Sequence, residues 1–176
     1  KKTKLKYGEG FIVGNKKYKF DGFLGKPEVD TRRVPRYSMN INECTLCKKS
    51  WFYRYSKKNM EIYKAPHLLV KQAPRQRKGF YATYLDFDAV FTQSFVGIHG
   101  DEKILKYLSL LINSKLFTYF SLMTSSRWLI ERDEIEVNVL ENFPIPDINL
   151  DMNFNNKIDS LFEYASKTPE NGQNRI

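Results

Sequence analysis

Cysteine and histidine are scarce in this chain of 176 residues, which holds two of each. Cys44 and Cys47 form a C-x-x-C pair, but a closed structural zinc site needs four ligands. His67 and His99 follow Cys47 by 20 and 52 residues, a spacing that zinc fingers and ribbons do not use. We therefore expect two ordinary reduced thiols, no bound metal and a reducing, cytoplasmic environment. With so few histidines, nothing suggests the placed base of a hydrolytic triad.

Long apolar runs are absent as well. No window of about 18 residues is continuously apolar, which argues against a membrane-spanning helix. The basic start, residues 1–6, is followed by no apolar segment and does not resemble a secretory signal. The sequence contains no Walker loop and no set of kinase motifs. We expect a binding module without catalytic residues and, because the first residue is not Met, a piece of a longer protein.

Positive charge is abundant and unevenly spread. The formal net charge is +9, but residues 1–80 carry 21 Lys/Arg against 6 Asp/Glu, while residues 81–176 carry 8 against 14. A half-chain with such an excess is typical of proteins that bind nucleic acid or an anionic membrane. A membrane surface would favour an amphipathic basic helix, whereas these residues lie in strand-like segments broken by Pro and Gly. Charge therefore favours nucleic acid, with a merely solvated basic surface as the alternative.

Aromatic residues are plentiful, with 13 Phe, 11 Tyr and 2 Trp in an apolar fraction of 41%. This composition supports a hydrophobic core and argues against global disorder. Up to about residue 100, strand patterns are short and bounded by Gly, Pro and charged residues. Gly14-Asn15 predicts the turn of a hairpin. The further strand-like segments are 51–55, 67–72, 80–85 and 89–92, and residues 97–100 are expected to close this half.

The periodicity changes at residue 101. Apolar residues at helical spacing predict one long helix near 101–123, although Asn113-Ser114-Lys115 interrupts its apolar stretch. A C-terminal helix is predicted near 155–167. We therefore expect an α+β fold with short mixed or antiparallel strands and hairpins in residues 1–100, followed by these helices. Residues 1–167 are expected to form a single domain, and residues 168–176 a flexible tail.

The turn between segments 67–72 and 80–85 concentrates the side chains that proteins use to bind DNA. Arg and Gln read base edges in the major groove, and Lys binds phosphates. The predicted DNA-binding residues of this turn are Lys71, Gln72, Arg75, Gln76, Arg77 and Lys78. Of these, Gln72, Arg75 and Arg77 are expected to read base edges. A second candidate loop carries Arg32, Arg33 and Arg36, and Arg127 follows the long helix. The alternative for each loop is a solvated turn without a partner.

Three stretches together resemble a known family. They are Tyr63–Gln72, with an aromatic-x-x-Pro-x-(apolar)3-basic pattern, Leu108–Leu116, which contains Leu-Leu-Ile-Asn-Ser-Lys-Leu, and Phe143-Pro144-Ile145-Pro146. Their order and separation are similar to those in the target-recognition domain of TaqI-like adenine-N6 DNA methyltransferases of bacterial restriction–modification systems. The resemblance implies an α+β domain that clasps double-stranded DNA against a covalently linked N-terminal methyltransferase domain.

That partner domain binds S-adenosylmethionine and carries an Asn-Pro-Pro-Tyr-like motif, which this chain lacks. The resemblance therefore implies recognition and not catalysis: the chain alone is expected to be no enzyme and to bind no cofactor. It would be part of a site-specific adenine DNA methyltransferase. Whether a restriction endonuclease is fused to that enzyme stays open.

Two other functions fit parts of the sequence. In a binder of single-stranded DNA or RNA, the aromatic residues 51–53 and Tyr55 would stack on bases between lysines. Alternating strand residues face opposite ways, so at most half of these rings could form such a platform. In a protein assembly domain, the long helix would be the interface, and binding would depend little on salt.

Overall fold

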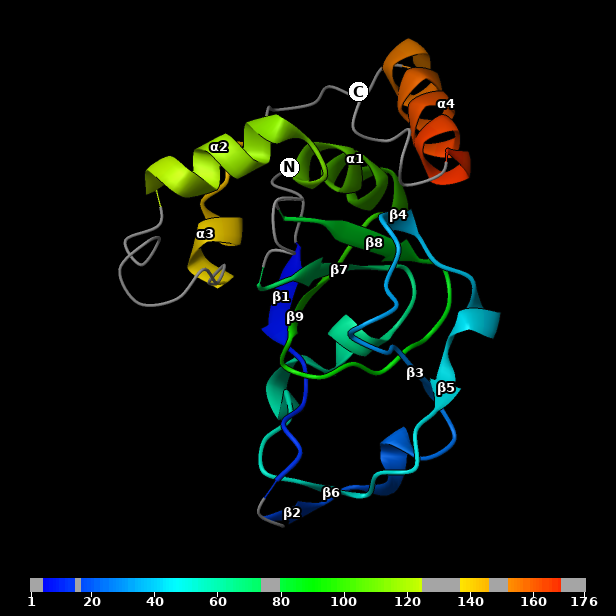
Figure 1. Ribbon diagram of the computed structural model, residues 1–176, viewed down its shortest axis with the longest axis vertical. Coiled ribbons are helices and arrows are strands. Elements are labelled where there is room, and N and C mark those ends of the chain that lie inside the picture. Colours follow the sequence, from blue (N-terminus) through cyan, green and yellow to red (C-terminus); the bar gives the residue numbers. More distant parts are fainter. Residues whose placement is uncertain (1–4, 15–16, 74–79, 125–136, 146–151, 169–176) are drawn as a thin grey trace.

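The computed structural model describes residues 5–14, 17–73, 80–124, 137–145 and 152–168. Its centre is a five-stranded sheet in the order β1-β9-β7-β8-β4 (Figure 1). The strands are β1 (Lys6–Glu9), β9 (Phe95–His99), β7 (His67–Lys71), β8 (Ala82–Leu85) and β4 (Tyr37–Ser38). All neighbours are antiparallel except β4 and β8, which are parallel. The predicted pairing of segments 67–72 and 80–85 is confirmed, with His67 opposite Leu85 and Val70 opposite Ala82.

Two small ribbons and three 3-10 segments complete the strand-rich part. The ribbons pair β2 (Tyr18–Lys19) with β6 (Trp51–Phe52), and β3 (Pro27–Glu28) with β5 (Thr45–Leu46). The 3-10 segments are η1 (Asp21–Phe23), η2 (Ile41–Glu43) and η3 (Lys57–Tyr63). The Ala65–Pro66 peptide bond that precedes β7 is cis.

The described residues after the sheet form four helices: α1 (Glu102–Ile112), α2 (Lys115–Thr124), α3 (Val137–Glu141) and α4 (Met152–Lys167). Asp101 caps α1, because its carboxylate accepts from the backbone N of Lys103 at 3.0 Å and of Ile104 at 3.3 Å. The α+β class is confirmed. The C-terminal helix is confirmed as well, and it begins at Met152, three residues before the predicted start at 155.

The prediction of one long helix over 101–123 is wrong, because the helix ends at Ile112 and a new one begins at Lys115. At the break, Asn113 turns its side chain to the backbone of β8, and Ser114 Oγ donates back to Leu111 O at 2.5 Å. These bonds replace the regular hydrogen bonds of a continuous helix. Helix α2 therefore leaves in a new direction (Figure 1).

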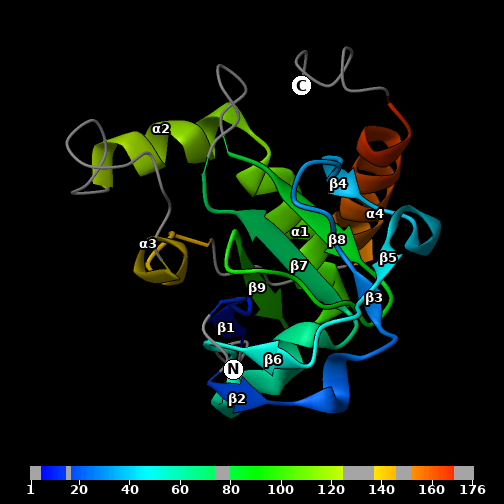
Figure 2. The same ribbon diagram turned by 60° about the horizontal axis from the view of Figure 1, so that its bottom comes forward.

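Hydrophobic residues cover both faces of the sheet. Because strand side chains alternate, Leu68 and Val70 face one cluster and Leu69 faces the other. Helices α1 and α4 pack on the first face, and the ribbons and the segments η1 and η3 lie over the second (Figures 1 and 2). The second cluster is rich in aromatic rings. Its fully buried large side chains include Phe11, Phe23, Phe52, Tyr63, Phe91 and Phe95.

Three strand predictions are wrong in detail. The flanks of Gly14 do not pair with each other, since β1 pairs with β9 and β2 with β6. Segment 89–92 makes only isolated bridges, whereas β9, around Gly97, is a full strand of the sheet. Gly97 is required there because a Cβ atom at this position would lie 2.5 Å from Cζ of Phe91. Segment 51–55 forms a strand only at Trp51–Phe52.

Candidate nucleic-acid interface

The β7–β8 hairpin places Lys71 and Gln72 at the end of β7. The backbone is held there from two sides: Lys71 N donates to Tyr81 O at 3.0 Å, and Gln72 N donates to Ser94 O at 3.0 Å. The ammonium of Lys71 lies 4.8 Å from the ring centroid of Phe95, a cation–π contact. Both predicted DNA-binding side chains are half-buried. The base of the hairpin is thus fixed to the sheet, which is the rigid support that a reading element needs.

Residues 31–36 form a second basic segment, which we call the arginine loop. The carboxylate of Asp30 accepts from Arg32 N at 3.0 Å and from Arg32 Nε at 3.3 Å. These hydrogen bonds hold the pKa of Asp30 below its usual value, and the bond from the backbone of Arg32 has a larger effect than the bond from its guanidinium. Val34 is buried and anchors the loop, while Arg32 and Arg33 are exposed. Both arginines thus lie on the surface, and the first of them forms an ion pair with Asp30.

Arg36 ends the arginine loop at the turn between α1 and α2, where its Nη1 donates to Asn113 O at 3.5 Å. Asn113 is buried. Its Nδ2 donates to Ala82 O and to Ser109 O, both at 2.8 Å, and its Oδ1 accepts from Ala82 N at 3.2 Å. The side-chain amide therefore pairs with Ala82 as a neighbouring strand would. Asn113 joins the helix turn, the start of β8 and the arginine loop.

The two basic segments meet at one end of the sheet. Lys71 Nζ donates to Thr31 O at 3.5 Å, which joins the hairpin to the arginine loop across 40 residues of sequence. Thr83 Oγ1 donates to Pro35 O, which fixes the far side of the loop to β8. We call this region the basic end. Its members are Arg32, Arg33, Arg36, Lys71 and Gln72.

The remaining predicted DNA-binding residues are Arg75, Gln76, Arg77, Lys78 and Arg127, and they lie outside the described residues. The first four belong in sequence to the turn that β7 and β8 flank. Asn113 was missed as a member of the interface, since sequence reasoning treated it only as a break in an apolar stripe. A buried Asn inside a helical pattern is itself a signal, because its amide has to find partners away from solvent.

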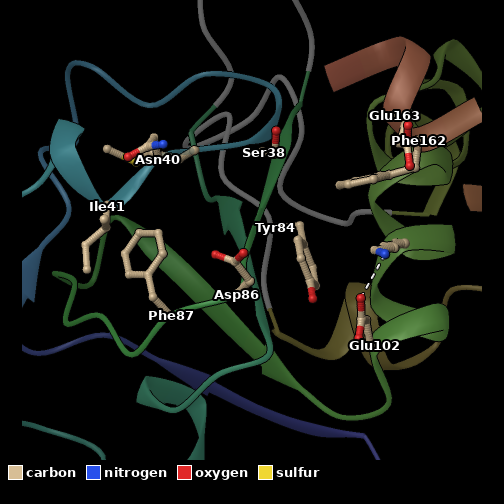
Figure 3. A pocket seen from close by; sticks show the side chains of 11 residues that line it. Ser38, Asn40, Ile41, Tyr84, Asp86, Phe87, Glu102, Phe162 and Glu163 are labelled. Carbon is tan, nitrogen blue, oxygen red and sulfur yellow. Dashed lines mark ion pairs between the residues drawn. The ribbon is translucent and has the colours of Figure 1, made fainter. Parts of the chain in front are cut away.

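The far end of β8 borders a pocket of about 690 Å³, which we call the acidic pocket (Figure 3). Its lining includes carboxylates from the sheet and both large helices: Asp86, Glu102 and Glu163. Tyr84 and Phe162 provide aromatic walls, with ring centroids 5.6 Å apart. Figure 3 shows Tyr84 between Asp86 and the ion pair that Glu102 makes. A pocket of this charge does not suit phosphate groups.

Lys106 is the cation of the acidic pocket. Its Nζ lies 2.8 Å from Glu102 Oε1 and 3.4 Å from Asp159 Oδ1. Burial lowers the pKa of Lys106, but the bonds to Glu102 and Asp159 outweigh it and raise the pKa overall. Burial, together with the charges of Glu102 and Asp86, raises the pKa of Tyr84. Lys106 therefore stays charged and Tyr84 stays neutral at ordinary pH.

The two histidines serve structural roles in this geometry. His67 is fully buried at the start of β7, with Nδ1 2.6 Å from Ile62 O and Nε2 3.1 Å from Phe87 O. Burial lowers the pKa of His67 to about 4, against the opposing effect of these carbonyls. His99 Nδ1 lies 3.0 Å from Pro66 O. The ring nitrogens of His67 and Nδ1 of His99 therefore contact backbone carbonyls.

The two cysteines are free thiols. Cys47 is buried and Cys44 half-buried. Burial, with a smaller contribution from Glu43, raises the pKa of Cys44 to about 11, and burial also raises the pKa of Cys47. A thiol with a raised pKa carries little thiolate at neutral pH and is a poor nucleophile.

No protein-family model and no curated protein matches the chain. Among the helices that the structure describes, none is long and apolar enough to cross a membrane. Among the described side chains, no three His, Cys, Asp or Glu residues gather where they could hold a metal ion. The features that bear on function are therefore the basic end, the acidic pocket and the exposed surfaces of ribbons and helices.

Proposed function

We propose that this chain binds duplex DNA as the target-recognition domain of an adenine-N6 DNA methyltransferase of a restriction–modification system. The observation that carries the proposal is the meeting of two separately predicted basic segments at one end of the sheet, through Lys71 and Thr31. Arg and Gln side chains there would read base edges, and Lys71 would contact phosphate. Methyl transfer and S-adenosylmethionine binding would belong to a methyltransferase domain linked to the N-terminus, in the cytoplasm.

The packing of the three resembling stretches supports this proposal. Leu68 and Val70 of the first stretch, Leu108 and Ile112 of the second and Phe143 of the third all belong to the hydrophobic cluster under α1. The stretches thus form one structural unit and are not unrelated surface motifs. Pro146, the last residue of the third stretch, lies outside the described residues.

Local charge supports it as well. Within residues 29–39 and 67–73 the sequence holds four Lys or Arg and one acid, Asp30. That acid is bound to Arg32, which limits its repulsion of an approaching phosphate. The tip of the hairpin adds further cations in sequence. Phosphate contacts from such residues dominate the affinity of DNA-binding proteins and make it depend on salt.

Helix α2 offers a surface for the linked methyltransferase domain. Leu116, Tyr119 and Met123 recur at i, i+3 and i+7 and are 61%, 63% and 69% exposed. An apolar stripe on the outer side of a helix is typical of an interface. The same stripe favours the second candidate function, a protein assembly domain without a nucleic-acid partner. The two functions differ in their response to salt, because only nucleic-acid binding releases condensed counterions.

The experiment is a salt titration of binding between the isolated chain and a labelled duplex, measured by fluorescence anisotropy. We expect weak binding whose logarithm falls linearly with the logarithm of salt concentration, with a slope of about 0.9 for each phosphate contacted. Arg33→Ala should lower the affinity and, if Arg33 binds phosphate, reduce the slope by about one. Lys167→Ala is the matched control, since Lys167 is an exposed cation paired with Glu163 on α4. No binding at low salt, or equal losses in both variants, would contradict the proposal.

A further inference from the structure

The ribbon of β2 and β6 presents aromatic rings on the side away from the core. Phe52 points inward and is fully buried, so its neighbours Trp51 and Tyr53 point outward and are 41% and 47% exposed. The ribbon lies at the bottom of Figure 1 and comes forward in Figure 2. It is distinct from the basic end, which β7, β8 and the arginine loop form.

Lysines lie among these rings. The ammonium of Lys17 is 5.5 Å from the ring centroid of Tyr18 and 5.6 Å from that of Tyr53. Lys19 is the cross-strand partner of Trp51 in the register of the ribbon. The alternation of residues places Lys17 and Lys19 on the same outer side as the two exposed rings. Cations and π-faces thus share one side of the ribbon.

A further lysine contacts two half-buried rings of the same region. The ammonium of Lys57 lies 3.9 Å from the ring centroid of Tyr18 and 5.4 Å from that of Tyr55. Tyr55 in turn stacks on Phe20, with centroids 4.8 Å apart and planes at 21°. Of Lys17 and Lys57, Lys17 is the one that contacts an exposed ring, that of Tyr53.

The ribbon is firmly supported from behind. The ring of Phe52 packs edge-on against Phe11 at 5.0 Å and against Phe23 at 5.4 Å between centroids. Tyr53 N donates to Ile12 O at 2.9 Å, and Lys17 N donates to Phe52 O at 3.3 Å. Exposed rings on a braced backbone lose little conformational freedom when they bind, which favours binding.

We propose that this ribbon is a second nucleic-acid site, which binds an unpaired DNA strand. Unpaired bases would stack on Trp51 and Tyr53, and the adjacent lysines would contact the phosphates between them. Base faces are hidden within a duplex, so exposed rings gain little from double-stranded DNA. The cations favour an anionic ligand over an apolar protein surface. This site goes beyond the proposed function, which concerns duplex binding at the basic end.

The test is binding of a single-stranded oligothymidylate of about 12 nucleotides by the isolated chain and its variants. Trp51→Ala and Tyr53→Ala should each weaken binding on the order of tenfold, while duplex affinity stays unchanged. Tyr164→Ala, which removes an even more exposed ring (62%) from α4, is the matched control and should bind as the wild type does. Tryptophan fluorescence should be quenched by the strand, and Trp51→Phe should abolish the quenching.

An abasic strand of equal length and charge separates stacking from simple attraction between charges. The abasic strand should bind the wild-type chain about as weakly as the oligothymidylate binds Trp51→Ala. Equal binding of both strands by the wild-type chain, or unchanged oligothymidylate binding by both ring variants, would overturn the ribbon site. If the wild-type chain binds the oligothymidylate but no duplex, the proposed function is contradicted and the ribbon site is not.

Discussion

The two ends of strand β8 carry opposite charge. At its start, Ala82 is bound by Asn113, beside Arg36 and the arginine loop. Beyond Tyr84 lie Asp86 and the carboxylates of the acidic pocket. A strand of four residues spans only about 13 Å, so the two regions are close neighbours. An approaching polyanion is attracted by one and repelled by the other, which under the proposed function would set the side from which DNA binds.

The two ends also differ in what holds them together. Apart from the Asp30–Arg32 ion pair and the ammonium of Lys71, backbone and amide hydrogen bonds hold the basic end, those of Asn113 above all, and these bonds do not titrate. The acidic end depends on ion pairs of Lys106 and on the neutral, buried His67. Salt should therefore act mainly on binding at the basic end, and pH mainly on stability at the acidic end.

Asn113→Ala should have the largest effect. The change leaves the N–H and C=O of Ala82 without their partner inside the core. Because an unsatisfied buried group costs about 1–3 kcal/mol, we expect a loss of about 2–4 kcal/mol in the free energy of unfolding. Urea denaturation measures it. Ser114→Ala, which removes a half-buried hydroxyl from the same turn, serves as the control and should lose about 1 kcal/mol or less. A loss below about 0.5 kcal/mol in Asn113→Ala would contradict the role of Asn113.

Local patterns predicted the elements that local sequence determines. The β7–β8 hairpin follows from two apolar segments that flank a Pro- and Gly-containing turn. Helix α4 follows from its periodic apolar residues. Strand β9 was missed because Gly97 is typical of turns. Glycine is needed at this position because the ring of Phe91 lies against it, and this contact is visible only in the fold.

The features that local patterns did not predict depend on contacts between residues far apart in the sequence. The pairing of β1 with β9 joins residues about 90 positions apart, and no local pattern in either strand specifies it. The two basic loops of the candidate site were each predicted from composition, but their meeting depends on the contact of Lys71 with Thr31. The break after Ile112 likewise depends on Ala82, 31 residues before Asn113. The surface positions of Trp51 and Tyr53, in contrast, follow from simple alternation.

The acidic end should respond to pH through His67. The imidazole has a pKa of about 4 in the folded chain and about 6.5 in the unfolded chain, so the unfolded state binds more protons between these values. Stability is therefore full above about pH 6.5 and falls toward pH 4 by roughly 1.4 kcal/mol per pH unit. Denaturation at several pH values measures this slope.

Two variants test whether His67 causes this pH dependence of stability. His67→Gln should remove it, and His99→Gln should keep it, because His99 is not enclosed in the core. Stability that instead rises on acidification would mean that Ile62 O and Phe87 O hold the imidazolium inside the protein.

The hairpin turn should affect recognition and not stability. If the chain is part of a methyltransferase as proposed, Arg75→Ala or Arg77→Ala in that enzyme should reduce methylation of the cognate site, because a lost bidentate base contact costs about 1–3 kcal/mol. On the sequence-based expectation that this basic turn lies outside the core, the melting temperature should hardly change, since surface substitutions usually stay within about 0.5 kcal/mol. Methylation of the cognate and of singly altered sites measures the loss. Wild-type methylation by both variants would transfer the reading role to Arg32, Arg33 and Arg36.

The smallest effects should come from removing one positive charge at each end. Lys106→Met keeps the aliphatic stem beside Tyr84 and Phe162 but breaks both ion pairs. We expect a loss of about 0.5–1 kcal/mol in stability, because partly exposed ion pairs contribute little, and an unchanged affinity for duplex DNA. Arg33→Met should do the reverse, with unchanged stability and weaker DNA binding. Urea denaturation and anisotropy on the two proteins measure both quantities. Equal loss of DNA affinity in both variants would mean that net charge, and not the position of the charge at the basic end, determines binding.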